Sequence, residues 1–119
     1  MPSRTLPTVL VLEHEPQVLR VLGDILARAG FTVLPASSGE RALRLYEQHR
    51  SAVGLLVIDD LPPEIEQLAR RHPGLKVLRL SGFAEGQFAN DLPVLSKPFT
   101  PAALVEAVRS ALSTPGALP

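Results

Sequence analysis

The segment Val53–Asp60 constrains the fold more than any other part of this chain. An apolar run from Val53 to Ile58 ends abruptly at two acids, Asp59 and Asp60. A strand this hydrophobic must be covered on both faces, which is typical of a buried parallel sheet. Ligands of open α/β sheets bind at the edge formed by the carboxyl ends of the strands. We therefore expect Asp59 to emerge at a binding edge.

Two further segments are expected to end at the same edge. Thr8–Leu12 runs into Glu13-His14-Glu15-Pro16, and Leu92–Ser96 runs into Lys97-Pro98. Carboxylates beside a lysine at one sheet edge indicate a site for a cation and a phosphoryl group.

Strand-like and helix-like segments alternate along the chain, which predicts stacked βα units. We expect strands over Thr8–Leu12, Phe31–Leu34, Val53–Ile58, Leu75–Leu80 and Leu92–Ser96. We expect helices from Pro16 to Gly30, after a Ser37/Glu40 capping box, over Glu64–Arg71, and from Thr100-Pro101 to Leu112. The first helix is expected to bury Val18, Leu22, Ile25, Leu26 and Ala29. Residues 82–92 hold two glycines and little periodicity, so one turn of helix or a loop is expected there.

Length and composition narrow the class of protein. A chain of 119 residues normally forms one domain, and its 12 basic and 12 acidic residues cancel, so no overall field attracts nucleic acid or a membrane. The lack of cysteine excludes disulfides and thiolate sites. Without a membrane-spanning run or a signal peptide's pattern, we expect a cytoplasmic domain over residues 8–112. Residues 1–7 are expected to form an extension and residues 113–119 a flexible tail.

Four motifs, in order, resemble the receiver domain of two-component response regulators. Leu10–Pro16 resembles the family's acidic pair followed by Glu-Pro, and Leu55–Asp59 with Pro63 resembles the phosphoacceptor strand and its loop. Leu78–Gly82 resembles the strand that ends in the switch hydroxyl, and Lys97-Pro98-Phe99-Thr100 resembles the Lys-Pro-Phe motif, which usually carries a cis peptide. The resemblance implies a doubly wound, flavodoxin-like, five-stranded parallel sheet of order 2-1-3-4-5. Short segments at 63–75 and 82–92 indicate shortened third and fourth helices.

The resemblance also implies roles for individual residues. Asp59 would accept a phosphoryl group from a histidine kinase or phosphotransfer protein, with Ser81 and Lys97 holding the phosphoryl oxygens. Glu13 and His14 would form the acidic pocket, and Asp59, Glu13 and the backbone carbonyl of Leu61 would bind Mg²⁺. Such a domain is a phosphoacceptor rather than an enzyme, and it passes its signal to a downstream signalling protein or a second copy of itself.

The chain departs from the family pattern at His14, where a second aspartate is usual. Mg²⁺ prefers oxygen ligands in near-ideal octahedral geometry, whereas imidazole suits Mn²⁺ and later metals. We therefore expect Mg²⁺ binding to be weak or absent, with Mn²⁺ as the alternative. Two interpretations of His14 remain: a non-ligand that fills the pocket, hydrogen-bonded to Asp59, or a residue with a softer metal or a pH-dependent role. Val94 stands where the family often has an aromatic switch residue.

Three classes of function fit the sequence. The first is a receiver phosphorylated on Asp59, and the second is a degenerate receiver that binds proteins independently of phosphorylation. The third is a nucleotide or flavin binder. This class is disfavoured because the loop Glu13–Pro16 is acidic and has no glycine, so it repels anions instead of cradling phosphate. The sequence therefore predicts a receiver-like signalling domain with atypical phosphorylation chemistry.

Overall fold

The computed structural model describes residues 7–59, 62–81 and 94–113. Its elements, in chain order, are β1 (Thr8–Leu12), α1 (Pro16–Arg28), β2 (Thr32–Ala36), α2 (Gly39–Gln48), β3 (Val53–Ile58), α3 (Pro63–Arg71), β4 (Lys76–Ser81), β5 (Val94–Ser96) and α4 (Pro101–Ser113). The strands pair in the order β2-β1-β3-β4-β5, and every pairing is parallel. The predicted α/β class and parallel sheet are therefore confirmed. The turn of helix or loop expected over residues 82–92 lies outside the described residues.

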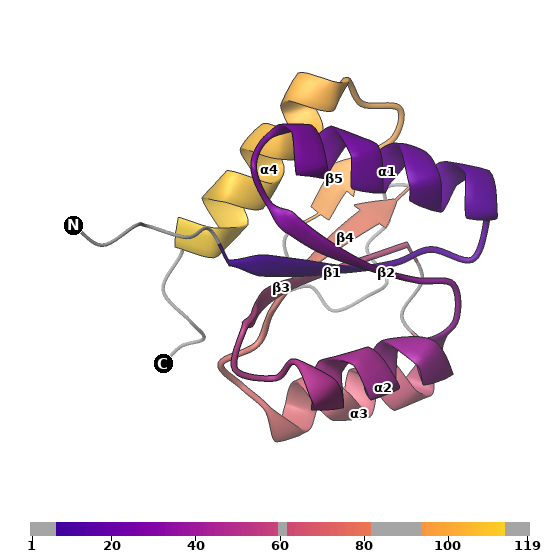
Figure 1. Cartoon of the computed structure of the whole chain (residues 1–119), viewed down its shortest axis with the longest axis vertical. Helices are drawn as coiled ribbons and strands as arrows, with labels where there is room; N and C mark the ends of the chain where they lie inside the picture. The colour runs from indigo at the N-terminus through magenta and orange to yellow at the C-terminus, as the bar shows by residue number, and fades with distance from the viewer. Residues whose placement is uncertain (1–6, 60–61, 82–93, 114–119) are drawn as a thin grey trace.

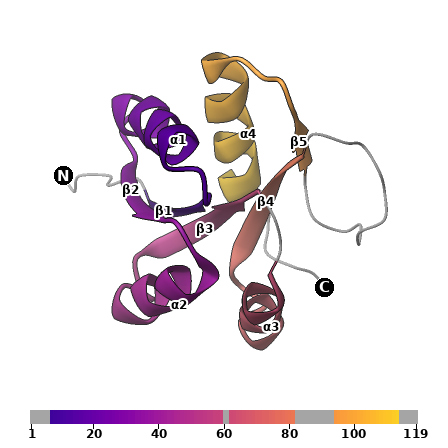
Figure 2. The same cartoon turned by 90° about the vertical axis from the view of Figure 1, so that its right-hand side faces the viewer.

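The sheet forms the middle of three layers. Helices α1 and α4 cover one face, and α2 and α3 cover the other (Figures 1 and 2). Successive side chains of a strand point to opposite faces, so β1 and β3 supply residues to two hydrophobic cores. The first core contains Val9, Val11, Leu55, Val57, Leu26 and Leu104, and the second contains Leu10, Leu12, Leu56, Ile58, Ala42 and Ile65. Because β1 and β3 are buried on both faces, they are the continuous apolar runs that the sequence shows.

Helix ends follow local chemistry, with one correction. Pro16 and Pro63 stand in the first turns of α1 and α3, where no intrahelical partner is available for an N–H. Gly30 follows α1 with a φ of 101°, a backbone conformation that favours glycine. The predicted capping box at Ser37 is wrong. Ser38 caps α2 instead, since its Oγ accepts a hydrogen bond from the Arg41 N–H at 3.1 Å.

Two further details differ from the expectations. Val18, expected to be buried, is 38% exposed. It lies in the first turn of α1, beside the edge of the sheet where the covering strands end. The second strand is shifted along the chain to Thr32–Ala36 and includes Pro35. A proline is tolerated there because β2 is an edge strand and need not donate a second row of hydrogen bonds.

Candidate functional site

Loops that follow β3 and β5 bring an acid and a lysine together. Asp59 comes directly after β3, and Lys97 comes directly after β5. The Lys97 Nζ donates a hydrogen bond to Asp59 Oδ1 at 2.9 Å, and the two side chains are 35% and 22% exposed. The predicted convergence of these two residues, which are 38 positions apart, is therefore confirmed. A pair of this kind offers solvent a carboxylate oxygen next to a fixed positive charge.

Glu13 lies in the same site but is buried. Its backbone N–H donates to the Ala36 carbonyl oxygen at 3.0 Å, which extends the β1–β2 pairing by one residue. Its side chain accepts a hydrogen bond from the Glu15 N–H through Oε2 at 3.1 Å. The other oxygen, Oε1, is buried, and it has no hydrogen-bond partner among the described residues.

Burial sets the ionisation of Glu13. Loss of hydration raises the pKa of its carboxyl group above the usual value, and the negative charge of Asp59 raises it further. The Glu15 N–H and the positive charge of Lys97 act in the opposite direction and lower the pKa. The net direction is upward, so ionisation of this carboxyl group is less favourable in the folded protein than in water.

His14 completes a group of three side chains of the types that can ligate a metal ion. Glu13, His14 and Asp59 each present a ligand atom, and these atoms all lie within 4.8 Å of one another. The His14 side chain is exposed, and within the described ranges no hydrogen bond joins it to Asp59. The hydrogen bond to Asp59 that one interpretation of His14 included is therefore absent from the described structure, whereas the choice between a ligand and a non-ligand role stays open. Its ring lies at the rim of the site and is open to solvent.

The donor set decides which cation suits the site. An unpartnered buried carboxylate oxygen and two further donors favour a divalent cation. One of the three donors is an imidazole nitrogen, however, and Mg²⁺ prefers oxygen ligands in octahedral geometry. The residues present therefore do not fit Mg²⁺, the ion that the resemblance implies. The predicted carbonyl ligand of Leu61 lies outside the described residues.

Ser81 and the Lys97-Pro98 peptide bond also lie at the carboxyl edge of the sheet. Ser81 is the last residue of β4 and pairs with Ser96 of β5, which places its backbone at the carboxyl end of the sheet. The side chains of Ser81 and Val94 are outside the described part of the structure. The peptide bond between Lys97 and Pro98 is cis, as the motif implies.

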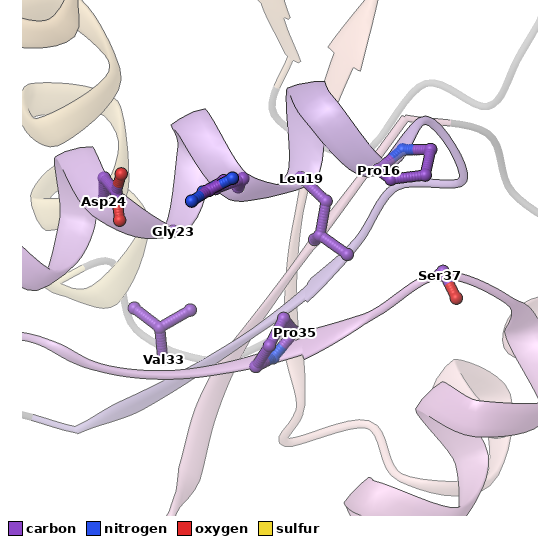
Figure 3. Close-up of a pocket in the computed structure, with 8 residues that line it drawn as sticks. Pro16, Leu19, Gly23, Asp24, Val33, Pro35 and Ser37 are labelled. Carbon is purple, nitrogen blue, oxygen red and sulfur yellow. The ribbon is translucent and has the colours of Figure 1, made fainter.

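A groove that the sequence analysis did not predict lies between α1 and β2 (Figure 3). It encloses about 540 Å³, and its lining residues are Pro16, Leu19, Arg20, Gly23, Asp24, Val33, Pro35 and Ser37. None of them belongs to the predicted site. The sequence gives little indication of this groove, because Val33 and Leu19 are residue types that usually lie in a core. Its one sign is the apolar face of the edge strand β2 next to α1.

The order of the parallel strands and the position of the site at their carboxyl ends define a flavodoxin-like α/β domain. Comparison with known proteins identifies the family within this class. A response regulator receiver protein from Sinorhizobium medicae WSM419 is 30% identical, with a TM-score of 0.74 over 89% of this chain and 94% of that one. The receiver domain of the hybrid histidine kinase CckA is 29% identical, with a TM-score of 0.72 over 89% and 99% of the two chains. This chain belongs to the receiver domains of two-component response regulators.

Curated relatives are longer than this chain. The sensor kinase CckA of Brucella abortus (strain 2308) is 34% identical over 117 residues, which cover 88% of this chain and 12% of the kinase. The response regulator GtcR of Aneurinibacillus migulanus is 30% identical over 118 residues, and the match covers 47% of its length. The chain thus spans less than half the length of these relatives. No protein-family model matches it.

A membrane-spanning helix is absent from the described ranges. No helix there has both the length and the apolar character needed to cross a bilayer.

Proposed function

We propose that this receiver domain accepts a phosphoryl group on Asp59 from a phosphohistidine of a histidine kinase or phosphotransfer protein. The observation that carries the proposal is the 2.9 Å contact between Lys97 Nζ and Asp59 Oδ1 at the carboxyl edge of the sheet. The Asp59 side chain is 22% exposed, which leaves an oxygen accessible to a donor. An acid that served only to end a strand would not need a lysine partner 38 positions away in the chain.

The chemistry requires little beyond position and charge. An oxygen of the Asp59 carboxylate attacks phosphorus while the phosphorus–nitrogen bond of the donor breaks. The donor imidazole keeps that electron pair and takes up a proton, and Asp59 becomes an acyl phosphate. Negative charge spreads over the equatorial phosphoryl oxygens during the transfer, and the Lys97 ammonium stabilises it. Ser81 supplies a hydroxyl for one of these oxygens.

Atypical metal dependence is part of the proposal. A bound divalent ion would neutralise charge on the phosphoryl oxygens. Glu13, His14 and Asp59 are the residues that would hold it. Because His14 contributes nitrogen, phosphorylation is expected to be poor with Mg²⁺ and better with Mn²⁺.

A second candidate function is supported by the same departure. If the altered donor set abolishes phosphoryl transfer, the domain acts as a protein-interaction module whose control does not depend on phosphorylation. In either case the partners are signalling proteins, with a second copy of this chain among them.

The test is incubation with acetyl phosphate in the presence of Mg²⁺ or Mn²⁺, followed by intact mass measurement. We expect a gain of one phosphoryl group with Mn²⁺, little gain with Mg²⁺, and none in Asp59→Asn. Asp24→Asn, which changes an exposed acid on α1, is the matched control and should behave as wild type. Lys97→Met should slow the reaction by roughly 100-fold or more, as loss of a charge-stabilising donor does.

Each outcome of this test separates the candidates. Full phosphorylation with Mg²⁺ alone would show that His14 does not impair Mg²⁺-dependent phosphorylation. A lack of mass gain with every ion would leave the interaction module as the function.

A further inference from the structure

We infer that Glu13, His14 and Asp59 form a binding site for a borderline transition ion, represented by Co²⁺ or Zn²⁺, that discriminates against Mg²⁺ through the His14 imidazole. The inference deepens the proposed function by assigning the ion class and its ligands. It rests on that function only for its consequence, because ion binding can be measured without phosphoryl transfer.

The first support is geometric. Ligand atoms of the three side chains lie within 4.8 Å of one another. Two ligands of one zinc ion, each about 2.0–2.2 Å from the metal, can be up to about 4.4 Å apart. Because the His14 side chain is exposed, its ring has room to turn toward the two acids.

The second support is independent of that spacing. Glu13 is only 3% exposed, and its Oε1 is buried without a hydrogen-bond partner in the described structure. An ionised carboxylate is costly to bury unless a cation or a donor compensates it. The Lys97 ammonium lowers the pKa of Glu13 through its charge, but it donates its hydrogen bond to Asp59 and leaves Glu13 Oε1 without a hydrogen-bond partner in the described ranges. A metal ion among the three side chains would satisfy this oxygen.

The third step is the identity of the ion. An imidazole and two carboxylates are the donor types of zinc sites with three protein ligands, which leave a fourth position open. For mixed nitrogen and oxygen ligands, affinity rises from Mn²⁺ through Co²⁺, and Zn²⁺ also binds strongly. Mg²⁺ gains little from a nitrogen ligand. A steep rise in affinity from Mg²⁺ through Mn²⁺ to Co²⁺ and Zn²⁺ would therefore indicate that His14 is a ligand.

The Lys97 ammonium competes with a bound metal ion for the Asp59 carboxylate. The ammonium is hydrogen-bonded to Asp59, one of the three ligands, at 2.9 Å. An ion bound there shares this carboxylate with a neighbouring positive charge, so the ion and the lysine oppose each other. The supply of transition ion thus tunes how Asp59 is presented to a phosphoryl donor.

The experiment measures the dissociation constants of Mg²⁺, Mn²⁺, Co²⁺ and Zn²⁺ by isothermal titration calorimetry on the full chain. Affinity should rise in that order, and bound Co²⁺ should show visible absorption bands. His14→Asp should lower the ratio of Zn²⁺ to Mg²⁺ affinity by at least about 100-fold, since loss of even an outer-shell partner costs about 10–100-fold. His49→Gln is the matched control, because His49 is an exposed histidine at the end of α2. Lys97→Met should tighten ion binding several-fold.

Two results would overturn the inference: equal affinities for Mg²⁺ and Zn²⁺, or an unchanged ratio in His14→Asp. Circular dichroism of each variant checks that it is folded, and the Co²⁺ spectrum of the wild type gives a readout that needs no variant. A steep ion series without a mass gain from acetyl phosphate would refute the proposed function alone. A mass gain on Asp59 with a flat series would refute this inference alone.

Discussion

Glu13 combines two requirements that oppose each other. Its backbone continues a buried parallel strand, which draws its side chain out of water, while its carboxylate faces Asp59. Burial and this neighbouring negative charge both raise the pKa of Glu13. The folded protein without metal therefore holds the Glu13 proton more tightly than the unfolded chain does. The proposed cation site would account for this local cost.

The pH dependence of stability should reveal this cost. The pKa of Glu13 is raised above its ordinary value of 4.5, so its stabilising contribution is fully present below pH 4.5 and is lost as the pH rises through the higher folded-state value. In metal-free buffer, Glu13→Gln should therefore gain stability relative to wild type between pH 4.5 and neutrality. Thermal unfolding at several pH values in EDTA measures this. Identical pH slopes for the two proteins would contradict it.

Helix α2 shows how a single cap positions an element. Ser38 has extended backbone angles, and its hydroxyl oxygen accepts from the Arg41 N–H. The preceding residue, Ser37, is exposed, and its hydroxyl forms no hydrogen bond within the part of the chain that the structure describes. From the sequence, either serine can cap, because adjacent hydroxyl residues have the same propensity. The choice follows from the length of β2, which ends at Ala36 and brings the chain to the helix start one residue later than the capping-box pattern predicts.

Replacement of these two serines tests this assignment. Ser38→Ala should lower the free energy of unfolding by about 1 kcal/mol, because one N–H at the start of α2 loses its partner. Ser37→Ala should change it by less than about 0.5 kcal/mol, as exposed substitutions usually do. Urea denaturation of both variants measures the difference. Equal losses, or a larger loss for Ser37→Ala, would contradict the assignment.

At the end of the sheet opposite the candidate site, both ends of the described chain meet the central strands. The register of β1 against β3 shifts between Thr8 and Val9, which leaves Gly54 as the extra residue of β3. A Cβ atom on Gly54 would lie 2.8 Å from Pro7 Cβ and 3.3 Å from Leu112 Cδ2. The Lys76 Nζ also donates to the Leu112 carbonyl oxygen at 2.6 Å, which ties the end of α4 to β4. The absence of a side chain at Gly54 thus allows these segments to pack closely.

Gly54→Ala should therefore destabilise the whole domain. We expect a loss of about 1–3 kcal/mol, the usual cost of overpacking. Gly74→Ala is the matched control, since nothing lies within 4 Å of the position that its Cβ would occupy. Chemical denaturation monitored by circular dichroism compares the two variants. A neutral Gly54→Ala would show that Pro7 and Leu112 move aside freely.

Local patterns were sufficient to predict the parallel α/β architecture and the meeting of Asp59 and Lys97 at one edge. The physical reason is that strand hydrophobicity depends on burial on both faces, and parallel strands must all end at the same side. The burial of Glu13 without a partner, the exposed ring of His14 within reach of the two acids, and the close approach at Gly54 followed only from the tertiary structure. These features depend on side-chain distances of a few ångströms between segments far apart in the chain, and such distances are set by packing at a scale that residue type and spacing do not determine.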